Sequence, residues 1–350
     1  MKHIFIALTA CAITASAQVR LQIMQAENST SRIQTDIKLD QILQLAGQEI
    51  ITHNSQTFTT EHTTGVRAKN GTLRATATIK KWVSKWTFPG GITMEFNSAV
   101  PKNIRDGPIA LKQLQHIIDL LYVIKEHPVT YIYYKSGAIK EVELLGLYVK
   151  EVDPISKEPV KYELSKDFKK KKIANLIKQE FNPDGTANER KQQHARLPNK
   201  VVFKGDTWVR NETMKLDGNQ VMNFRINYKY EGTITKTKNT PELHRITGQV
   251  TDVAYEMKAE DADPLKVKNS QLKVAKTKIE LLFQSTNPKE IKDEKSGGLL
   301  YVRHRGRFVK SENLIQAKGD MTFEANGQEL PGKLDLTIEK NITTTPKEKK

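Results

Sequence analysis

The stretch "MNFRINYKY" at residues 222–230 alternates apolar and polar side chains without a break. Met222, Phe224, Ile226, Tyr228 and Tyr230 share one parity, and the polar residues lie between them. Successive side chains of a β-strand point to opposite faces, so this pattern predicts a strand with one buried and one solvated face. Such strands are typical of antiparallel sheets, because parallel sheets are usually covered on both faces.

The same period of two recurs at 73–80 and at 333–339, near the two ends of the chain. Asn70-Gly71 and Asp217-Gly218 stand between alternating runs and predict tight hairpins, because these pairs tolerate positive φ. The alternation slips near Thr251, which predicts a β-bulge and a bent strand. The sequence therefore predicts a mainly β protein of curved, half-barrel-like antiparallel sheets.

Two segments have helical periodicity instead. Residues 109–124 follow a proline and place Leu111, Leu114, Ile118 and Leu121 on one face, which predicts an amphipathic helix packed on a sheet. A second helix is expected over 165–181. Residues 182–194 have no apolar periodicity and are typical of a linker.

The linker divides the chain into two sequential halves of ordinary domain size. We expect an N-terminal β-rich half at 18–163, a basic helix and linker at 164–194, and a C-terminal β-rich half at 195–342. Residues 343–350 are expected to be a basic disordered tail. The stretches "ITMEFNSAVPKN" (92–103) and "IELLFQSTNPKE" (279–290) resemble each other, so a duplication of the halves stays open, with each copy expected to end a strand at Ser-x-x-Pro.

The N-terminus has the layout of a secretory signal peptide, with Lys2, an apolar run and the small-x-small site at 15–17. We expect cleavage after Ala17 and export to the periplasm or cell surface of a Gram-negative bacterium. An alternative is lipid anchoring through Cys11, the only cysteine, which follows "LTA". In the first case the mature chain has no disulfide and no cysteine ligand for a metal. No later segment is long and apolar enough to span a membrane.

The composition is strongly basic. Without Lys2, 55 Lys and Arg oppose 40 Asp and Glu, a net charge of +15. Nucleic acid is not expected as a partner of an exported protein, which leaves anionic lipid, acidic glycan or simply a solvated basic surface. The oligomeric state stays open.

The stretch "LPNKVVFKGDTWVRNETMKL" at 197–216 joins Leu-Pro, a short β run and Gly205-Asp206-Thr207-Trp208. It resembles an uncharacterised family of exported β-rich bacterial proteins, catalogued as a domain of unknown function, and the junction at 17–18 resembles cleavage sites common in Bacteroidetes. This resemblance implies a β-rich exported protein and no known activity. Read from the residues, the motif is a turn at Gly205 and Asp206 that starts a strand with a buried Trp208.

Catalytic motifs are absent from the sequence: there is no G-x-S-x-G, HExxH, phosphate-binding glycine loop or dinucleotide fingerprint. The histidines are scattered singly. We therefore expect no enzyme, no cofactor and no metal site.

Two hypotheses for function follow. The first is a non-catalytic envelope protein that binds or carries a lipid or other amphiphile in the hollow of a curved sheet, by analogy with folds of that shape. The second is a structural or interaction protein with no small ligand that contacts acidic glycan or a protein partner. The candidate ligand-binding residues are aromatic and apolar side chains with lysines that would steer an anionic headgroup: Trp82, Trp86, Trp208, Phe224, Ile226, Tyr228, Lys169, Lys170, Lys171 and Lys172. A cavity of at least roughly 300 Å³ would favour the carrier over the scaffold.

Overall fold

In the computed structural model the described residues are 18–100, 128–137, 139–144, 151–152, 159–160, 192–215, 220–234, 242–257, 265–293 and 299–347, with positions 118, 121 and 125. The expected signal peptide, the helix at 165–181 and most of the linker lie outside them. The named elements are β1 (Val19–Ile23), β2 (Thr30–Leu45), β3 (Gln48–Thr64), β4 (Leu73–Thr87), the 3-10 turn η1 (Pro89–Gly91), β5 (Thr93–Asn97), β6 (Val129–Tyr133), β7 (Ile139–Leu144), β8 (Glu151–Val152), β9 (Pro159–Val160), β10 (Thr207–Lys215), β11 (Gln220–Ile234), β12 (Leu243–Met257), β13 (Leu265–Asp293), β14 (Leu299–Ala325) and β15 (Gln328–Pro346).

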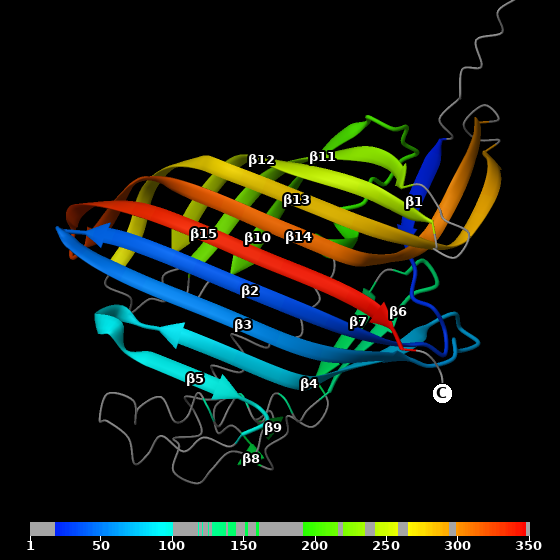
Figure 1. Cartoon of the computed structure of the whole chain (residues 1–350), viewed down its shortest axis with the longest axis horizontal. Helices are drawn as coiled ribbons and strands as arrows, with labels where there is room; N and C mark the ends of the chain where they lie inside the picture. The colour runs from blue at the N-terminus through cyan, green and yellow to red at the C-terminus, as the bar shows by residue number, and fades with distance from the viewer. Residues whose placement is uncertain are drawn as a thin grey trace, which may run out of the picture.

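Except for β8 and β9, which pair with each other in a separate two-stranded sheet, these strands form one large sheet with the order β10-β11-β12-β13-β14-β15-β2-β3-β4-β6-β7. β5 adds to β4, and β1 adds to β14 in the sheet's one parallel ladder among the described strands. The sheet curls, so that β10, β11 and β12 pass behind β14 and β15 (Figure 1). The end strands β10 and β7 are not paired with each other, and the sheet is open. The prediction of a curved antiparallel β fold is confirmed.

The two sequential halves do not form a sheet each. β2 and β15 pair along a continuous ladder from Leu45–Gly332 to Ser31–Pro346 and join both halves into one sheet. The same ladder corrects the expected disordered tail, because residues 343–346 are part of β15 and the Lys347 N–H donates to the Thr30 carbonyl at 2.9 Å. Both strands offer long edges with the same alternation, so pairing them satisfies backbone groups that either half alone would leave open.

The predicted strand faces are confirmed. In β11 the five residues of the apolar parity are almost fully buried, with exposed fractions of 0–3%. They belong to one apolar cluster that runs across the sheet from β10 to β2 and includes β1. Its largest contributions from other strands include Phe283, Phe323, Leu336 and Ile338. Side chains of the inner face therefore fill much of the space that the curled sheet encloses.

Local turn chemistry agrees with the sequence in most places. The predicted turn at Asn70-Gly71 lies in the connection between β3 and β4, with Gly71 at φ 82°, whereas the one at Asp217-Gly218 lies outside the described residues. Asn326 and Gly327 form a two-residue hairpin turn with φ of 51° and 78°. The β11–β12 register shifts at Thr251, as predicted. The turn after β2 was missed, because it uses Ala46 with φ of 50° where the sequence offers no Asn or Asp.

The two similar stretches fold differently. The first belongs to β5, which ends at Asn97 and turns with a Val100 N–H to Asn97 carbonyl hydrogen bond of 3.0 Å. In the second, β13 continues through Pro288 to Asp293, with register shifts after Leu282 and after Ser285. The expectation that both copies end a strand is wrong for the second, because β14 pairs with β13 along this whole stretch.

The predicted helix at 109–124 is described at two positions within that range. Ile118 and Leu121 are helical and buried, as is expected of one face of a helix packed on the sheet, and Lys125 just beyond is helical too. The other residues of this segment lie outside the described part.

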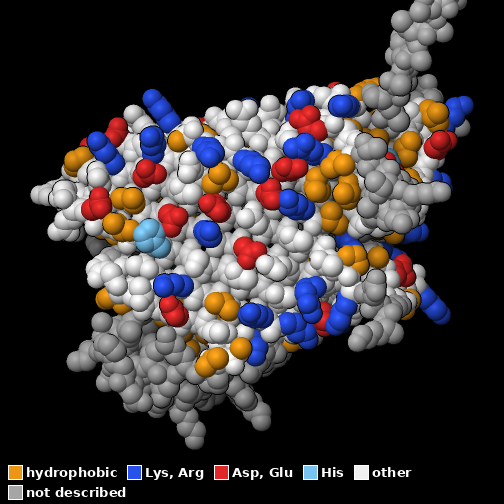
Figure 2. All heavy atoms as spheres, in the orientation of Figure 1, with side chains coloured by type: hydrophobic (Ala, Val, Ile, Leu, Met, Phe, Trp, Pro, Cys, Tyr) orange, Lys and Arg blue, Asp and Glu red, His pale blue; other side chains and the backbone are white. Residues whose placement is uncertain are grey.

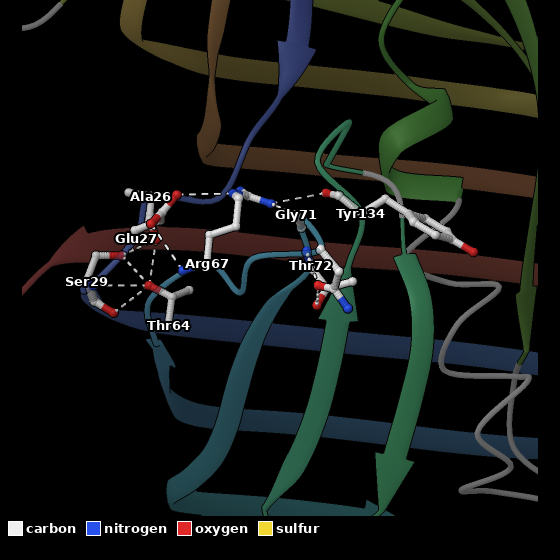
Figure 3. A network of polar contacts seen from close by, with 9 residues as sticks. Ala26, Glu27, Ser29, Thr64, Arg67, Gly71, Thr72 and Tyr134 are labelled. Carbon is white, nitrogen blue, oxygen red and sulfur yellow. Dashed lines mark hydrogen bonds and ion pairs between the residues drawn. The ribbon is translucent and has the colours of Figure 1, made fainter.

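A polar network holds the chain where it passes from β1 to β2 (Figure 3). The Thr64 hydroxyl donates to the Ala26 carbonyl at 2.6 Å, and Arg67 Nε donates to Glu27 Oε1 at 3.1 Å. The Arg67 backbone N–H also donates to Glu27, which lowers the pKa of that carboxyl. These contacts hold the connection between β1, which pairs with β14, and β2, which pairs with β15 and β3.

Candidate functional site

The continuous sheet is interrupted in one of its ladders. β12 and β13 pair for six residues, from Leu243–Gln284 to Gly248–Ile279. Beyond Gly248, β12 continues to pair with β11, while β13 before Ile279 pairs with β14. The two strands diverge and leave an opening between them, which we call the β12–β13 slit.

Irregularities on both strands explain why they diverge. β12 carries the bulge at Thr251, and the β13–β14 register shifts between Val274 and Lys276. A β-bulge adds one residue to one strand, bends it and increases its twist. Each strand follows its own bent partner, and the hydrogen bonds between β12 and β13 end.

Side-chain hydroxyls span part of the slit. The Val250 N–H donates to Thr277 Oγ1 at 3.5 Å, and the Tyr255 N–H donates to Ser270 Oγ at 3.4 Å. Ser270 in turn donates to the Tyr255 carbonyl at 3.3 Å. These distances exceed those of strong hydrogen bonds. Weak contacts therefore replace the backbone ladder in this region.

The slit contains a cavity of about 450 Å³ that is open to solvent. Three of its lining residues, Val250, Val253 and Leu272, are buried apolar side chains, although polar atoms make up more of the lining surface than apolar atoms do. Its mouth is polar and has one charge of each sign, on the exposed side chains of Asp252 and Lys273. Gln249, Thr251 and Val274 complete the lining.

Three of the predicted ligand-binding residues lie beside this cavity rather than in its wall. Phe224, Ile226 and Tyr228 are buried in the core at 3%, 2% and 0% exposure. Across the β11–β12 ladder, Phe224 pairs with Val253 and Ile226 with Val250. The partners on β12, which the sequence did not single out, line the cavity.

Trp208 belongs to a buried polar network next to Tyr228. The two rings stack at 6.0 Å, and Trp208 Nε1 donates to the Arg196 carbonyl at 2.9 Å. The Arg196 guanidinium makes a two-pronged ion pair with Glu212, at 3.0 Å from Nε and 2.6 Å from Nη2, and Tyr228 donates its hydroxyl to the same carboxylate. Burial raises the pKa of Tyr228 well above its usual range, so the phenol remains a donor.

This network covers the edge strand β10. Residues 192–195 form a helical turn, and the Gln192 side chain accepts from the Thr213 N–H at 3.0 Å. The end of the predicted linker is thus ordered and blocks an edge that would otherwise be free to pair. The turn before β10 is as predicted, with Gly205 at φ 98° and the Asp206 carboxylate accepting from the Phe203 N–H at 3.0 Å.

Trp82 and Trp86 lie four residues apart on one face of β4, and the structure favours packing rather than ligand binding for Trp82. Its ring centroid lies 6.3 Å from that of Phe58 and 5.6 Å from that of Phe96, and its Nε1 donates to the Ser84 hydroxyl at 2.6 Å. Trp86 is half-buried. β4 and β10 lie near opposite ends of the strand order, so the tryptophans are not assembled into one site by neighbouring strands. The lysines 169–172 lie outside the described residues.

The outer face mixes both signs of charge. Figure 2 shows Lys and Arg interspersed with Asp and Glu over the face that carries β13–β15 and β2–β4 in Figure 1. Some side chains of opposite sign form exposed ion pairs, such as Lys85 Nζ with Glu95 Oε1 at 3.1 Å. The basic excess of the sequence does not form a single-sign field on this face.

Comparison with known proteins gives no family. No family model matches the sequence, and no curated protein matches it either. A solved structure on lipid–protein interactions in lipovitellin aligns with 92% of this chain at 11% identity and a TM-score of 0.36, and the chain spans 25% of that protein. The outer membrane protein OprG and OccK7 (OpdD), both from Pseudomonas aeruginosa, align at 6% identity with TM-scores of 0.21 and 0.22, over 93% and 91% of this chain and 99% of theirs. These scores are too low to support an argument about function. Within the described residues, no helix combines the length and apolar character needed to cross a membrane.

Proposed function

We propose that this protein is a non-catalytic binder of a single-chain amphiphile in the bacterial cell envelope, and that the β12–β13 slit receives the apolar chain. The observation that carries the proposal is the cavity of about 450 Å³ where the sheet parts, because it connects solvent with buried Val250, Val253 and Leu272. Pockets for one small molecule typically measure roughly 300–1,000 Å³, with an apolar lining and a few polar groups. The size suits one acyl chain better than a lipid with several.

The mouth of the slit suggests where a polar headgroup would lie. Lys273 is exposed and forms no ion pair with a described residue, and Lys276 is exposed three residues further along β13. An anionic headgroup beside these amines would be attracted, while Asp252 on the facing strand limits the net positive charge. The amphiphile we propose therefore has an apolar tail and a small anionic head.

The weak bridging contacts support entry through the slit. An amphiphile needs to displace only long hydrogen bonds at Val250 and Tyr255, whereas the neighbouring ladders are continuous backbone pairings. An envelope location is part of the same proposal and rests on the signal-like N-terminus.

A reversible disulfide tests the slit directly. Val250→Cys with Thr277→Cys continues the register of the last backbone pair, Gly248–Ile279, and the Val250 N–H already lies 3.5 Å from the Thr277 side chain. Cα atoms of paired cross-strand neighbours are about 4.5–5.5 Å apart, and a disulfide spans up to about 6.8 Å, so it tolerates a modest parting of the two strands just beyond the last backbone pair. The only native cysteine is Cys11, so the signal-free chain adds no competing thiol.

Binding of a fluorescent fatty acid would be measured for the oxidised and the reduced double variant. We expect at least a tenfold loss of affinity in the oxidised form and recovery on reduction, so the reduced protein is the matched control. Val274→Phe should fill the cavity and weaken binding, whereas Val66→Phe, at a position 67% exposed, should not. Equal binding by the oxidised and reduced forms would refute entry at the slit.

Organic extraction of the protein from its native envelope, followed by mass spectrometry, tests the function itself. We expect one equivalent of a single-chain amphiphile. An empty protein that also fails to bind the fluorescent fatty acid would favour the alternative, a structural or interaction protein whose packed inner face serves only stability. The solid packing of Phe224, Ile226 and Tyr228 is the feature that this alternative explains best.

A further inference from the structure

Two histidines that are far apart in the sequence meet inside the sheet. His244 on β12 and His304 on β14 are 0% and 3% exposed, and their ring centroids lie 4.2 Å apart. Glu242, directly before β12, places a carboxylate oxygen 3.7 Å from His244 Nε2. One ligand atom from each of these residues lies within 4.8 Å of the other two.

One nitrogen of this cluster is buried without a partner. His244 Nε2 has no hydrogen bond to any described residue, although it is shielded from solvent. Leaving a buried polar atom unpaired costs free energy of about 1–3 kcal/mol, so such atoms call for an explanation. The nearest acidic oxygen, on Glu242, is 3.7 Å away, which is too far for a hydrogen bond, so this nitrogen is left unsatisfied by the described residues.

The other nitrogens of the two rings are held by hydroxyls. His244 Nδ1 lies 2.8 Å from the Tyr230 hydroxyl, and His304 Nδ1 lies 3.0 Å from Ser285 Oγ. Histidines that bind metals usually hydrogen bond through the ring nitrogen that does not bind, which fixes the tautomer and the ring orientation. Both rings already have this second partner.

Glu242 is also held in place by a backbone hydrogen bond, and its partly exposed side chain connects the cluster with solvent. Its carbonyl accepts from the Ser285 N–H at 3.1 Å, which ties the acidic residue to the strand segment that holds His304. Its side chain is 28% exposed, whereas the imidazoles are buried. An ion can reach the cluster from the carboxylate side.

We propose that Glu242, His244 and His304 form a binding site for a divalent transition-metal ion, with Zn²⁺ as the best-suited ion. Two imidazoles and one carboxylate are a ligand set that Zn²⁺ uses, and imidazole disfavours Mg²⁺ and Ca²⁺. Ligand atoms around a tetrahedral Zn²⁺ are about 3.3 Å apart when the bonds are about 2.0 Å. The ligand atoms of this cluster lie within 4.8 Å of one another, so they must approach by up to about 1.5 Å when the ion binds. Three protein ligands leave a fourth position for water or another small ligand.

The experiment is a titration of the untagged, chelator-treated full protein with ZnCl₂ by isothermal calorimetry, with a competing chelator where binding is tight. We expect one equivalent to bind and the melting temperature to rise. Glu242→Gln and His304→Gln should weaken binding at least 100-fold. Tyr230→Phe removes the closer of the two hydroxyl partners of His244 Nδ1, at 2.8 Å, and leaves Thr233 Oγ1 at 3.4 Å; it should weaken binding by about 10-fold.

The matched control is His53→Gln. His53 also forms a pair with a carboxylate, Asp40, at 2.7 Å, but both side chains are more than half exposed. We expect this variant to bind Zn²⁺ like the parent protein. Circular dichroism checks the fold of each variant. Glu242→Gln is the decisive variant, because a substitution at this partly exposed side chain disturbs the fold less than one at a buried imidazole.

A second readout uses Co²⁺ in place of Zn²⁺. The strong visible absorption of four-coordinate Co²⁺ should appear with the parent protein and with His53→Gln, and it should be lost in Glu242→Gln. The proposal is overturned if the parent protein shows no saturable one-to-one binding, or if Glu242→Gln and His304→Gln bind as tightly as the parent. Neither outcome bears on amphiphile binding at the slit, because the two sites share no residue.

Discussion

Removing the Glu212 carboxylate should destabilise the protein strongly, because the largely buried Arg196 guanidinium would lose its counter-charge. Glu212 is 8% exposed and accepts hydrogen bonds from Arg196 through two guanidinium nitrogens and from the fully buried Tyr228. Breaking a buried ion pair by deleting one partner typically costs 3–5 kcal/mol. The Arg196 side chain retains 18% exposure, so partial solvation should reduce this, while the unpaired Tyr228 hydroxyl adds to it. We expect Glu212→Ala to lower the free energy of unfolding by about 3–4 kcal/mol.

A double-mutant cycle separates the charge from the shape. Glu212→Gln keeps the volume and an acceptor for Tyr228 but removes the negative charge, so we expect a loss of about 2 kcal/mol. Arg196→Met combined with Glu212→Gln should recover part of that loss, because no unpaired charge remains buried. The coupling between the two substitutions should be at least about 1.5 kcal/mol.

The assay is guanidinium chloride unfolding followed by tryptophan fluorescence, which reports on this region because Trp208 stacks on Tyr228. The control is Glu329→Gln at the ion pair with Lys268, whose side chains are 59% and 52% exposed. Exposed pairs contribute about 0–1 kcal/mol, so we expect little change there. If Glu212→Ala is no more harmful than Glu329→Gln, or if the coupling is near zero, the reasoning about the buried charge is wrong.

Three further predictions concern a close approach, a titration and the core. Gly319→Ala should lower the free energy of unfolding by more than about 2 kcal/mol, because its Cβ would lie 2.1 Å from the Gln271 carbonyl oxygen. Gly327→Ala has a φ of 78° but open space around it, and should cost about 1 kcal/mol in the same unfolding assay. Similar losses at both glycines would contradict this reasoning. Burial, with a smaller effect of His304, lowers the pKa of His244 to about 3. In the unfolded chain His244 therefore binds a proton near pH 6.5, whereas in the folded chain it stays neutral until about pH 3. The folded state thus loses stability as the pH falls from about 6.5 toward 3. Between pH 7.5 and pH 5 the metal-free protein should lose about 2 kcal/mol more than His244→Gln, and an equal pH dependence of the two would refute the shift. Phe323→Ala, at a fully buried ring in the core, should cost about 3–5 kcal/mol in urea unfolding, and a loss below 1 kcal/mol would show that the site collapses freely.

The assignment of strand faces could be made from the sequence. Alternation placed Phe224, Ile226 and Tyr228 on a buried face, and the slip in that alternation located the bulge at Thr251. These features are local, because the direction of a side chain depends on its position in its own strand and a bulge changes the parity of the residues that follow it. The turn at Asn70-Gly71, with Gly71 at φ 82°, was predicted from a local signal of the same kind.

The residues of the candidate sites required the tertiary structure. The alternating edges of β2 and β15 could have paired with several other strands, and the ladder that joins the two halves depends on the summed fit of both long edges. The slit exists because β12 and β13 follow different bent partners, a relation between strands that neither sequence segment contains. His244 and His304 read as isolated residues, since a period of two indicates only that each faces inward. The register of β12, β13 and β14 brings their rings within 4.2 Å of each other, and Arg196 meets Glu212 only because the preceding turn folds back over β10. Local periodicity thus determined which side chains are buried, and long-range strand pairing decided which of them meet.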